Sequence, residues 1–248
     1  MTSSPASTVL ATPDAGPGGF APKLQDGEEL IGTARVPDGV ELQLVRHGEG
    51  FTILLENTEL MSTEANASEE ALATMTCARL GDNPAPQLLI GGYGMGYTLR
   101  AALAQLDEKA TIYVAELVPE IIAWARGPMR KVTAGCLDDP RVTVIDADVA
   151  TLIGAARSGY DAILLDVDNG PEGLTTLIND RLYCKLGLEA AMRALRPGGI
   201  LAVWSAFADA AFTTRLEEVG FAVEVADVDA RPGDAKPLHV IWFARKPG

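Results

Sequence analysis

The sequence has few of the residues on which metal sites, disulfide frameworks and histidine-based catalysis depend. Its 248 residues include only two histidines and three cysteines. Cys77, Cys136 and Cys184 are far apart and form no C-x-x-C pair, which argues against a zinc site and favours a reducing, cytoplasmic location. His47 and His239 are too few for a histidine metal site or an evident triad. We therefore expect no metal in the site.

Basic residues and long apolar runs are also scarce. Acidic residues number 34 against 20 basic ones, and the net charge is −14. Because nonspecific nucleic-acid binding needs Lys and Arg to neutralise phosphates, this balance argues against a nucleic-acid partner. No apolar run reaches the roughly 18 residues that indicate a membrane span, so no membrane partner is expected. The negative charge would instead attract a small cationic substrate.

The composition changes along the chain and suggests three parts. Residues 1–23 are rich in Ser, Thr, Ala, Pro and Gly and lack the features of a signal peptide, so we predict a disordered tail. We predict a small N-terminal β domain over 24–66, with strands at 40–45, 51–55 and 59–62. The first two of these form a β-hairpin. The stretch that leads into the hairpin from Ile31 is expected to be a structural loop.

The remainder, 67–248, is predicted to be a Rossmann-like α/β domain. Ser68 is expected to cap a helix that runs to about residue 80. From residue 87, apolar strands alternate with helical patterns, which predicts a parallel sheet covered on both faces. The expected strands are 87–90, 111–115, 142–145, 161–165 and 199–204, and the expected helices are 97–106, 119–132, 149–157 and 179–195. A helix at 209–219 and strands at 222–228 and 238–244 complete the chain.

A glycine cluster after the first of these strands is the most informative motif. Gly91, Gly92, Gly94 and Gly96 lie between an apolar strand and a helix, the arrangement with which α/β proteins hold a nucleotide. The next strand ends in Glu116, about 20 residues further on, the spacing of a ribose-binding acid. The pattern therefore predicts a nucleotide or nucleoside site formed by these residues.

Further carboxylates follow the later strands, and ligands bind at these carboxyl ends in open parallel sheets. Asp148 can accept a hydrogen bond from an adenine amino group while the Val149 N–H serves the ring, although capping of the next helix is equally consistent. Asp166 is the strongest catalytic candidate, because a carboxylate that faces a cofactor can orient and deprotonate an amine. A loop-capping role is its structural alternative. Asp168 follows in the same loop.

Together these residues resemble the spermidine synthase family. The resemblance is strongest over 87–201 and includes the glycine loop, Glu116, Asp-Pro-Arg-Val at 139–142, Asp148 and the strand that leads to Asp166. The family has a class I methyltransferase-like fold with a small N-terminal β domain. The resemblance implies that Glu116 binds the ribose, Asp148 the adenine, and that Asp166 is the catalytic aspartate. The implied cofactor is S-adenosylmethionine or its decarboxylated form. Family members often form homodimers, for which the N-terminal hairpin would be a contact.

The amine-binding half of the family pattern is altered. The family has an Asp between its loop glycines that grips the aminopropyl amine, whereas this chain has Gly94 and Met95. Asn169 stands where the family has a second Asp, and Glu69 and Glu70 replace a Tyr-Gln pair near the substrate helix. The candidate substrate-binding residues are Asp168, Asn169, Glu69 and Glu70.

The predicted function is a transferase that alkylates a small, amine-containing acceptor with an adenosyl sulfonium. Without the loop Asp, methyl transfer is slightly favoured over the aminopropyl transfer of polyamine biosynthesis. A catalytically degenerate nucleoside-binding protein is the alternative outside enzymes. A dinucleotide-dependent oxidoreductase is disfavoured, because residues 91–96 do not give a clean G-x-G-x-x-G/A motif.

Overall fold

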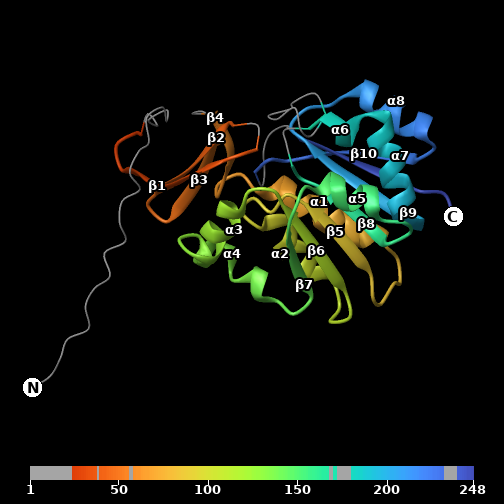
Figure 1. Ribbon diagram of the computed structural model, residues 1–248, viewed down its shortest axis with the longest axis horizontal. Coiled ribbons are helices and arrows are strands. Elements are labelled where there is room, and N and C mark those ends of the chain that lie inside the picture. The colour runs from red at the N-terminus through yellow and green to blue at the C-terminus, as the bar shows by residue number, and fades with distance from the viewer. Residues whose placement is uncertain (1–23, 38, 56–57, 168–169, 172–179, 232–238) are drawn as a thin grey trace, which may run out of the picture.

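Two β-sheets organise the chain in the computed structural model (Figure 1). The structure describes residues 24–37, 39–55, 58–167, 170–171, 180–231 and 239–248. The predicted tail over 1–23 and the candidates Asp168 and Asn169 lie outside these residues. Within the described ranges, no helix combines the length and apolar character needed to cross a membrane.

The N-terminal sheet is an antiparallel meander of four strands, whose order is β1-β2-β3-β4. These strands are β1 (Glu28–Arg35), β2 (Glu41–His47), β3 (Gly50–Leu55) and β4 (Thr58–Ser62). The predicted hairpin is confirmed as β2 and β3, and the predicted third strand as β4. The loop expected from Ile31 is wrong, because β1 pairs with β2 along its length.

Gly32 is the reason that β1 does not look like a strand in the sequence. Glycine weakens a strand pattern and often marks a bulge or a close approach, and both occur here. The pairing of β1 with β2 shifts between Leu30 and Gly32. A Cβ on Gly32 would lie 2.8 Å from Nε1 of Trp124, which belongs to α3 (Pro119–Arg126). Because Gly32 has no side chain, the small sheet can pack against a helix of the larger domain.

The second sheet has seven strands in the order β10-β11-β9-β8-β5-β6-β7. Its strands are β5 (Gln87–Gly91), β6 (Thr111–Glu116), β7 (Val142–Asp146), β8 (Tyr160–Leu165), β9 (Leu195–Ser205), β10 (Ala222–Val228) and β11 (His239–Arg245). The run from β7 to β9 is parallel, and β11 is antiparallel to both of its neighbours. Strand order reverses between β5 and β8, which is where ligands bind in such sheets. The predicted Rossmann-like, class I methyltransferase-like fold is confirmed.

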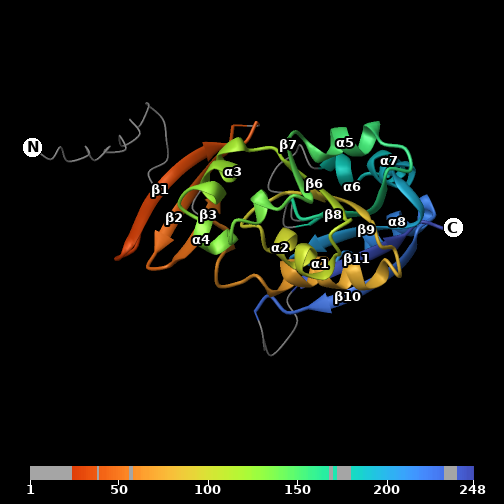
Figure 2. The same cartoon turned by 90° about the horizontal axis from the view of Figure 1, so that it is seen from below.

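Helices cover both faces of this sheet, as predicted (Figure 2). One layer contains α1 (Ala67–Arg79), α2 (Tyr97–Gln105) and α3, and the other contains α5 (Val149–Ala155), α6 (Asp180–Tyr183), α7 (Lys185–Ala194) and α8 (Ala210–Val219). Neighbouring residues of one strand serve opposite layers: Leu88 and Ile90 pack in the first core, and Leu89 packs in the second. This alternation explains why the central strands are apolar throughout.

Two helix predictions are wrong in their internal boundaries. The expected helix over 119–132 ends with α3 and resumes as α4 (Arg130–Thr133). Gly127 follows the end of α3, and Pro128 has no N–H with which to continue a helix. The expected helix over 179–195 is divided at Cys184 into α6 and α7.

The expected helix cap is also wrong. Asn66, not Ser68, is the N-cap residue of α1, and Asn66 makes no capping hydrogen bond with its side chain. Ser68 lies in the first turn, where its hydroxyl donates to Oε2 of Glu69 at 2.8 Å. The polar side chain that the sequence offered for capping is therefore bonded to a neighbouring carboxylate instead.

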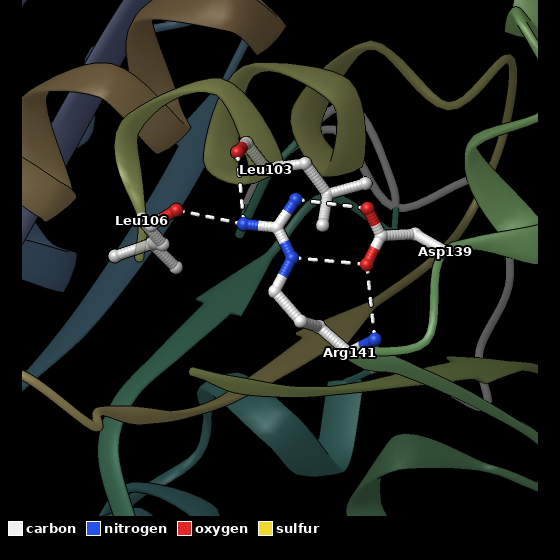
Figure 3. A network of polar contacts seen from close by, with 4 residues as sticks. All are labelled: Leu103, Leu106, Asp139 and Arg141. Atoms are coloured by element: carbon white, nitrogen blue, oxygen red, sulfur yellow. Dashed lines mark hydrogen bonds and ion pairs between the residues drawn. The ribbon is translucent and has the colours of Figure 1, made fainter. Parts of the chain in front are cut away.

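The Asp-Pro-Arg-Val segment lies at the amino ends of the strands, opposite the expected ligand site. The Arg141 guanidinium donates to both carboxylate oxygens of Asp139, with Nε–Oδ1 and Nη2–Oδ2 distances of 2.9 and 2.8 Å. Its Nη1 donates to the main-chain oxygens of Leu103 and Leu106 at 3.1 and 2.7 Å (Figure 3). Arg141 thereby satisfies carbonyls at the end of α2 and ties that helix to the start of β7.

Candidate functional site

Three predicted carboxylates, Glu116, Asp148 and Asp166, line one cavity at the carboxyl ends of the parallel strands. The cavity has an empty volume of about 790 Å³, which includes the space at its open mouth. Gly92 and Gly94 of the glycine loop also line it. The cavity therefore lies at the reversal of strand order between β5 and β8.

The glycine loop has a backbone that other residues rarely adopt. Gly92, Gly94 and Gly96 have φ values of +83°, +54° and +79°. A Cβ on Gly92 would lie 2.1 Å from the main-chain oxygen of Asp166, and one on Gly94 would lie 2.6 Å from Cε of Met61. The glycines thus hold the loop against the catalytic candidate on one side and the N-terminal sheet on the other.

Glu116 ends β6 as a buried carboxylate with defined orientation. Its Oε2 accepts the Tyr93 N–H and its Oε1 accepts the Val118 N–H, both at 2.9 Å. Burial raises the pKa of Glu116, and these backbone N–H groups oppose the rise. Backbone N–H groups therefore fix the orientation of Glu116, and its ribose-binding role stays a prediction.

Asp148 has the structural role that the sequence left open. It is the N-cap residue of α5, and its Oδ1 accepts the Ala150 N–H at 2.7 Å. Its other carboxylate oxygen forms an ion pair with Arg181 of α6, a partner that the sequence did not reveal. Val149, the first residue of α5, lines the cavity beside it. The adenine-binding role of Asp148 and Val149 stays a prediction.

Asp166 follows β8 directly and is half-buried. Its Oδ2 accepts a hydrogen bond from Oγ1 of Thr98 at 2.9 Å. Burial raises the pKa of Asp166 to about 6, and the Thr98 hydrogen bond opposes that rise. A carboxyl group with a pKa near neutrality is suited to exchange a proton with an amine. Thr98, in the first turn of α2, is a site residue that the sequence motifs did not identify.

The two predicted substrate-binding glutamates occupy different environments. Glu69 is 8% exposed, whereas its neighbour Glu70 is exposed. Burial, and next the charge of Asp166, raise the pKa of Glu69 to about 7. The structure therefore brings Glu69, but not the side chain of Glu70, into the interior beside Asp166.

The N-terminal sheet supplies an apolar wall that the sequence did not predict. These lining residues come from the loop after β1 and from β2, β3 and β4, and they are Val36, Pro37, Leu42, Leu55, Leu60 and Met61. The alternation within β2 marks a buried face, but periodicity does not say what covers that face. Only the fold shows that it closes the cavity over the glycine loop.

Comparisons with known proteins agree with this architecture. The family described as spermine/spermidine synthase domain matches residues 66–211. A polyamine aminopropyltransferase from Mycobacterium tuberculosis is 39% identical over 127 residues, which cover 50% of this chain and 23% of that protein. Putrescine N-methyltransferase 4 from Nicotiana tabacum is 34% identical over 120 residues, which cover 48% of this chain and 29% of that protein.

The solved structures share the fold. Spermidine synthase from Thermotoga maritima superposes with a TM-score of 0.67 at 20% sequence identity, and the match covers 88% of this chain and 72% of that one. The chain spans less than a third of the length of the two curated relatives described above. The matched family segment contains the glycine loop, Glu116, Asp148 and Asp166. The chain belongs to the spermine/spermidine synthase domain family.

Proposed function

We propose that this chain is a transferase that binds an adenosyl sulfonium and alkylates a small cationic amine, with aminopropyl transfer as its reaction. The observation that carries the proposal is the meeting of Glu116 and Asp166 in one cavity at the strand-order reversal. Relatives named as polyamine aminopropyltransferases favour this reaction over the methyl transfer that the altered glycine loop suggested. The donor would then be decarboxylated S-adenosylmethionine.

Each of the cavity residues would have a separate role in binding or catalysis. Glu116 would accept the ribose hydroxyls, and Asp148 and the Val149 N–H would meet the adenine edge. Val118 and Ile121 also line the cavity and offer apolar surface to the ring. The bound nucleoside supplies a carbon made electrophilic by its positive sulfur. Asp166 would orient the acceptor amine and take its proton.

Methyl transfer from S-adenosylmethionine is a second candidate, and one contact favours it. The Met61 side chain lies against Gly94, where the family has an acid for the aminopropyl amine. An apolar thioether at that place offers no charge to a cationic donor tail. The relative named as a putrescine N-methyltransferase supports the same alternative.

Calorimetric titration would test the proposal. S-adenosylmethionine, its decarboxylated form, methylthioadenosine and NAD should be titrated separately, and turnover should then be measured with diamine acceptors. We expect tightest binding of the decarboxylated nucleoside. Preference for S-adenosylmethionine would favour methyl transfer, and nucleoside binding without turnover would indicate a degenerate enzyme. Binding of NAD but of no sulfonium nucleoside would contradict the proposal.

A pair of glutamate variants would connect this binding to the cavity. Glu116→Gln should weaken nucleoside binding by roughly tenfold or more, because hydrogen bonds to a charged group are lost. Glu120→Gln, an exposed position on α3, removes the same charge and should leave the affinity unchanged. Equal affinities in the two variants would remove Glu116 from the ribose site.

A further inference from the structure

The hydroxyl group of Thr98 lies between two hydrogen-bond acceptors. Its Oγ1 is 2.9 Å from Oδ2 of Asp166 and 3.2 Å from the main-chain oxygen of Glu69. Thr98 belongs to the first turn of α2, Glu69 belongs to the first turn of α1, and Asp166 follows β8. Thr98 is only 3% exposed. Residues from three elements thus meet at one buried hydroxyl group.

The two acceptors of Thr98 compete for a single hydrogen. A threonine hydroxyl has one hydrogen, so it cannot donate fully to both oxygens at the same time. When Asp166 is ionised, the hydrogen is held by Oδ2, because a carboxylate is a stronger acceptor than a neutral carbonyl. When Asp166 is protonated, that preference is lost, and the main-chain oxygen of Glu69 offers a second acceptor. The buried hydroxyl therefore has a partner in both protonation states of Asp166.

The contact with Thr98 engages only one of the two carboxylate oxygens of Asp166. Among the residues that the structure describes, Thr98 alone donates a hydrogen bond to this side chain, and the bond goes to Oδ2. Asp166 also lines the cavity, so Oδ1 is left for a ligand amine. A carboxylate that is held through one oxygen presents the other in a restricted range of directions. Thr98 thus orients Asp166 from the side of α2.

The carboxyl groups around Asp166 give it no counter-charge. Glu69 lies beside it on α1, where the charge of Asp166 raises the pKa of Glu69. Glu116 and Asp148 line the same cavity from β6 and from the start of α5. Each of these groups disfavours a negative charge on Asp166 when it is itself ionised.

Basic groups on the neighbouring elements have other partners. On α2, Nη1 of Arg100 donates to the main-chain oxygen of Val132 at 2.9 Å, and on β11, Nδ1 of His239 lies 2.8 Å from Oγ of Ser68. Burial raises the pKa of Asp166 to about 6, and the Thr98 hydrogen bond is what opposes this rise within the described part of the chain. A neutral hydroxyl thus does what a basic side chain does at many other carboxylates.

We propose that Thr98 is a positioning residue that keeps Asp166 ionised and directs its other oxygen to the acceptor amine. This inference rests on the proposed amine alkylation. In that reaction the acceptor ammonium gives one proton to Asp166, and the nitrogen lone pair forms a bond to the donor carbon. The carbon–sulfur bond breaks, and its electron pair stays on sulfur, which becomes a neutral thioether. Only an ionised Asp166 can take the proton, so the Thr98 hydrogen bond prepares the carboxylate for this step.

Carbon-13 nuclear magnetic resonance of the aspartate carboxyl groups tests this role without any turnover. The Asp166 signal is assigned by its absence in Asp166→Asn. Thr98→Val keeps the shape of the side chain and removes the hydroxyl. It should raise the midpoint of the Asp166 titration by about one pH unit, because a hydrogen bond to the charged form is lost. Thr98→Ser keeps the hydroxyl and should restore most of the wild-type midpoint.

Thr76→Val is the matched control for this titration. Thr76 is a fully buried threonine of α1, and its Oγ1 donates to the main-chain oxygen of Leu72 at 2.6 Å. Its replacement removes the same kind of buried hydroxyl and should leave the Asp166 midpoint unchanged. An unchanged midpoint in Thr98→Val, or an equal shift in Thr76→Val, would overturn the proposal.

Turnover measurements separate failure of this role from failure of the proposed function. In Thr98→Val, kcat/KM for the amine should fall about tenfold at pH 5, and the loss should narrow above pH 8, where Asp166 is ionised in both proteins. A loss by the same factor at every pH would mean that Thr98 only supports the fold. If the wild-type chain alkylates no amine, the proposed function fails, and the carboxyl titration still decides whether Thr98 controls Asp166.

Discussion

Two aspartates of the same sheet, Asp139 at its amino edge and Asp166 at its carboxyl edge, have opposite electrostatic environments. Hydrogen bonds from Arg141 hold the pKa of Asp139 below its usual value. Burial raises the pKa of Asp166 to about 6, and the hydrogen bond that it accepts comes from the neutral Thr98 hydroxyl. The first carboxylate stays ionised and joins a helix to a strand. The pKa of the second carboxyl group lies close to neutral pH, so this group can exchange a proton.

Both aspartates belong to the motifs that carry the family resemblance, so a motif match alone does not separate them. Their positions in the fold separate the two aspartates, because the carboxyl ends of parallel strands face the ligand and the amino ends do not. Both carboxylate oxygens of Asp139 accept hydrogen bonds from Arg141, whereas Asp166 lines a cavity. An acid of a family motif can thus be held in an ion pair at one edge of the sheet and line a cavity at the other.

The largest expected effect is on catalysis at the carboxyl edge. Asp166→Asn should lower kcat by roughly 10²–10⁴-fold, because the amide cannot accept the amine proton. Nucleoside affinity measured by calorimetry should stay within a few-fold of the wild type. Asp139→Asn is the matched change at the amino edge, and its turnover per folded molecule should be unchanged. Full activity in Asp166→Asn would move the catalytic role to another residue.

Substitutions at the amino edge should lower the stability of the fold and leave catalysis unchanged. Arg141→Ala removes the charged hydrogen bonds to Asp139 and those to two carbonyls at the C-terminal end of α2, so the free energy of unfolding should fall by about 2–3 kcal/mol. Arg130→Ala breaks an ion pair whose side chains are 60% and 52% exposed, and should change stability by about 0.5 kcal/mol or less. Urea unfolding measures both. Equal losses would mean that the Arg141 network contributes no more than a surface pair.

The sequence could predict those site residues whose position depends only on the residues next to them in the chain. Glu116 and Asp166 each end an apolar strand, and the glycines follow another, so short-range pattern was enough to place them. The contact between Ser68 and His239 joins residues 171 positions apart, and no local pattern encodes it. The strand around Gly32 was missed for a related reason, because the glycine is explained only by Trp124 from another element.

The pH dependence of stability should have opposite signs at the two edges. The folded-state pKa of Glu69 is raised from 4.5 to about 7, so between these values the folded chain binds more protons than the unfolded one. Stability therefore falls as pH rises through this window. The pKa of Asp139 is lowered from 3.8, so its contribution is present above that value and is lost as pH falls through the lower folded pKa.

Single variants should remove each trend separately. Glu69→Gln should reduce the loss of unfolding free energy between pH 5 and 8 by about 2 kcal/mol, since a pKa shift of one unit corresponds to about 1.4 kcal/mol. Asp139→Asn should instead flatten the acid side of the curve. Urea unfolding at pH 3, 5 and 8 gives both values. The prediction for Glu69 is wrong if its variant loses as much stability as the wild type on going from pH 5 to 8.

The smallest expected effect is at the apolar wall, where neither kind of carboxylate is present. Met61 lies against Gly94 and lines the cavity, so its replacement can test which donor tail lies there. Met61→Glu introduces an acid, which should favour the cationic aminopropyl tail and disfavour the carboxylate of S-adenosylmethionine. We expect the ratio of their affinities to shift about fivefold, or roughly 1 kcal/mol. Met61→Gln has the same shape without the charge and should not shift the ratio. If both variants give the same ratio, the donor tail does not pass this wall, and the altered loop says nothing about which group is transferred.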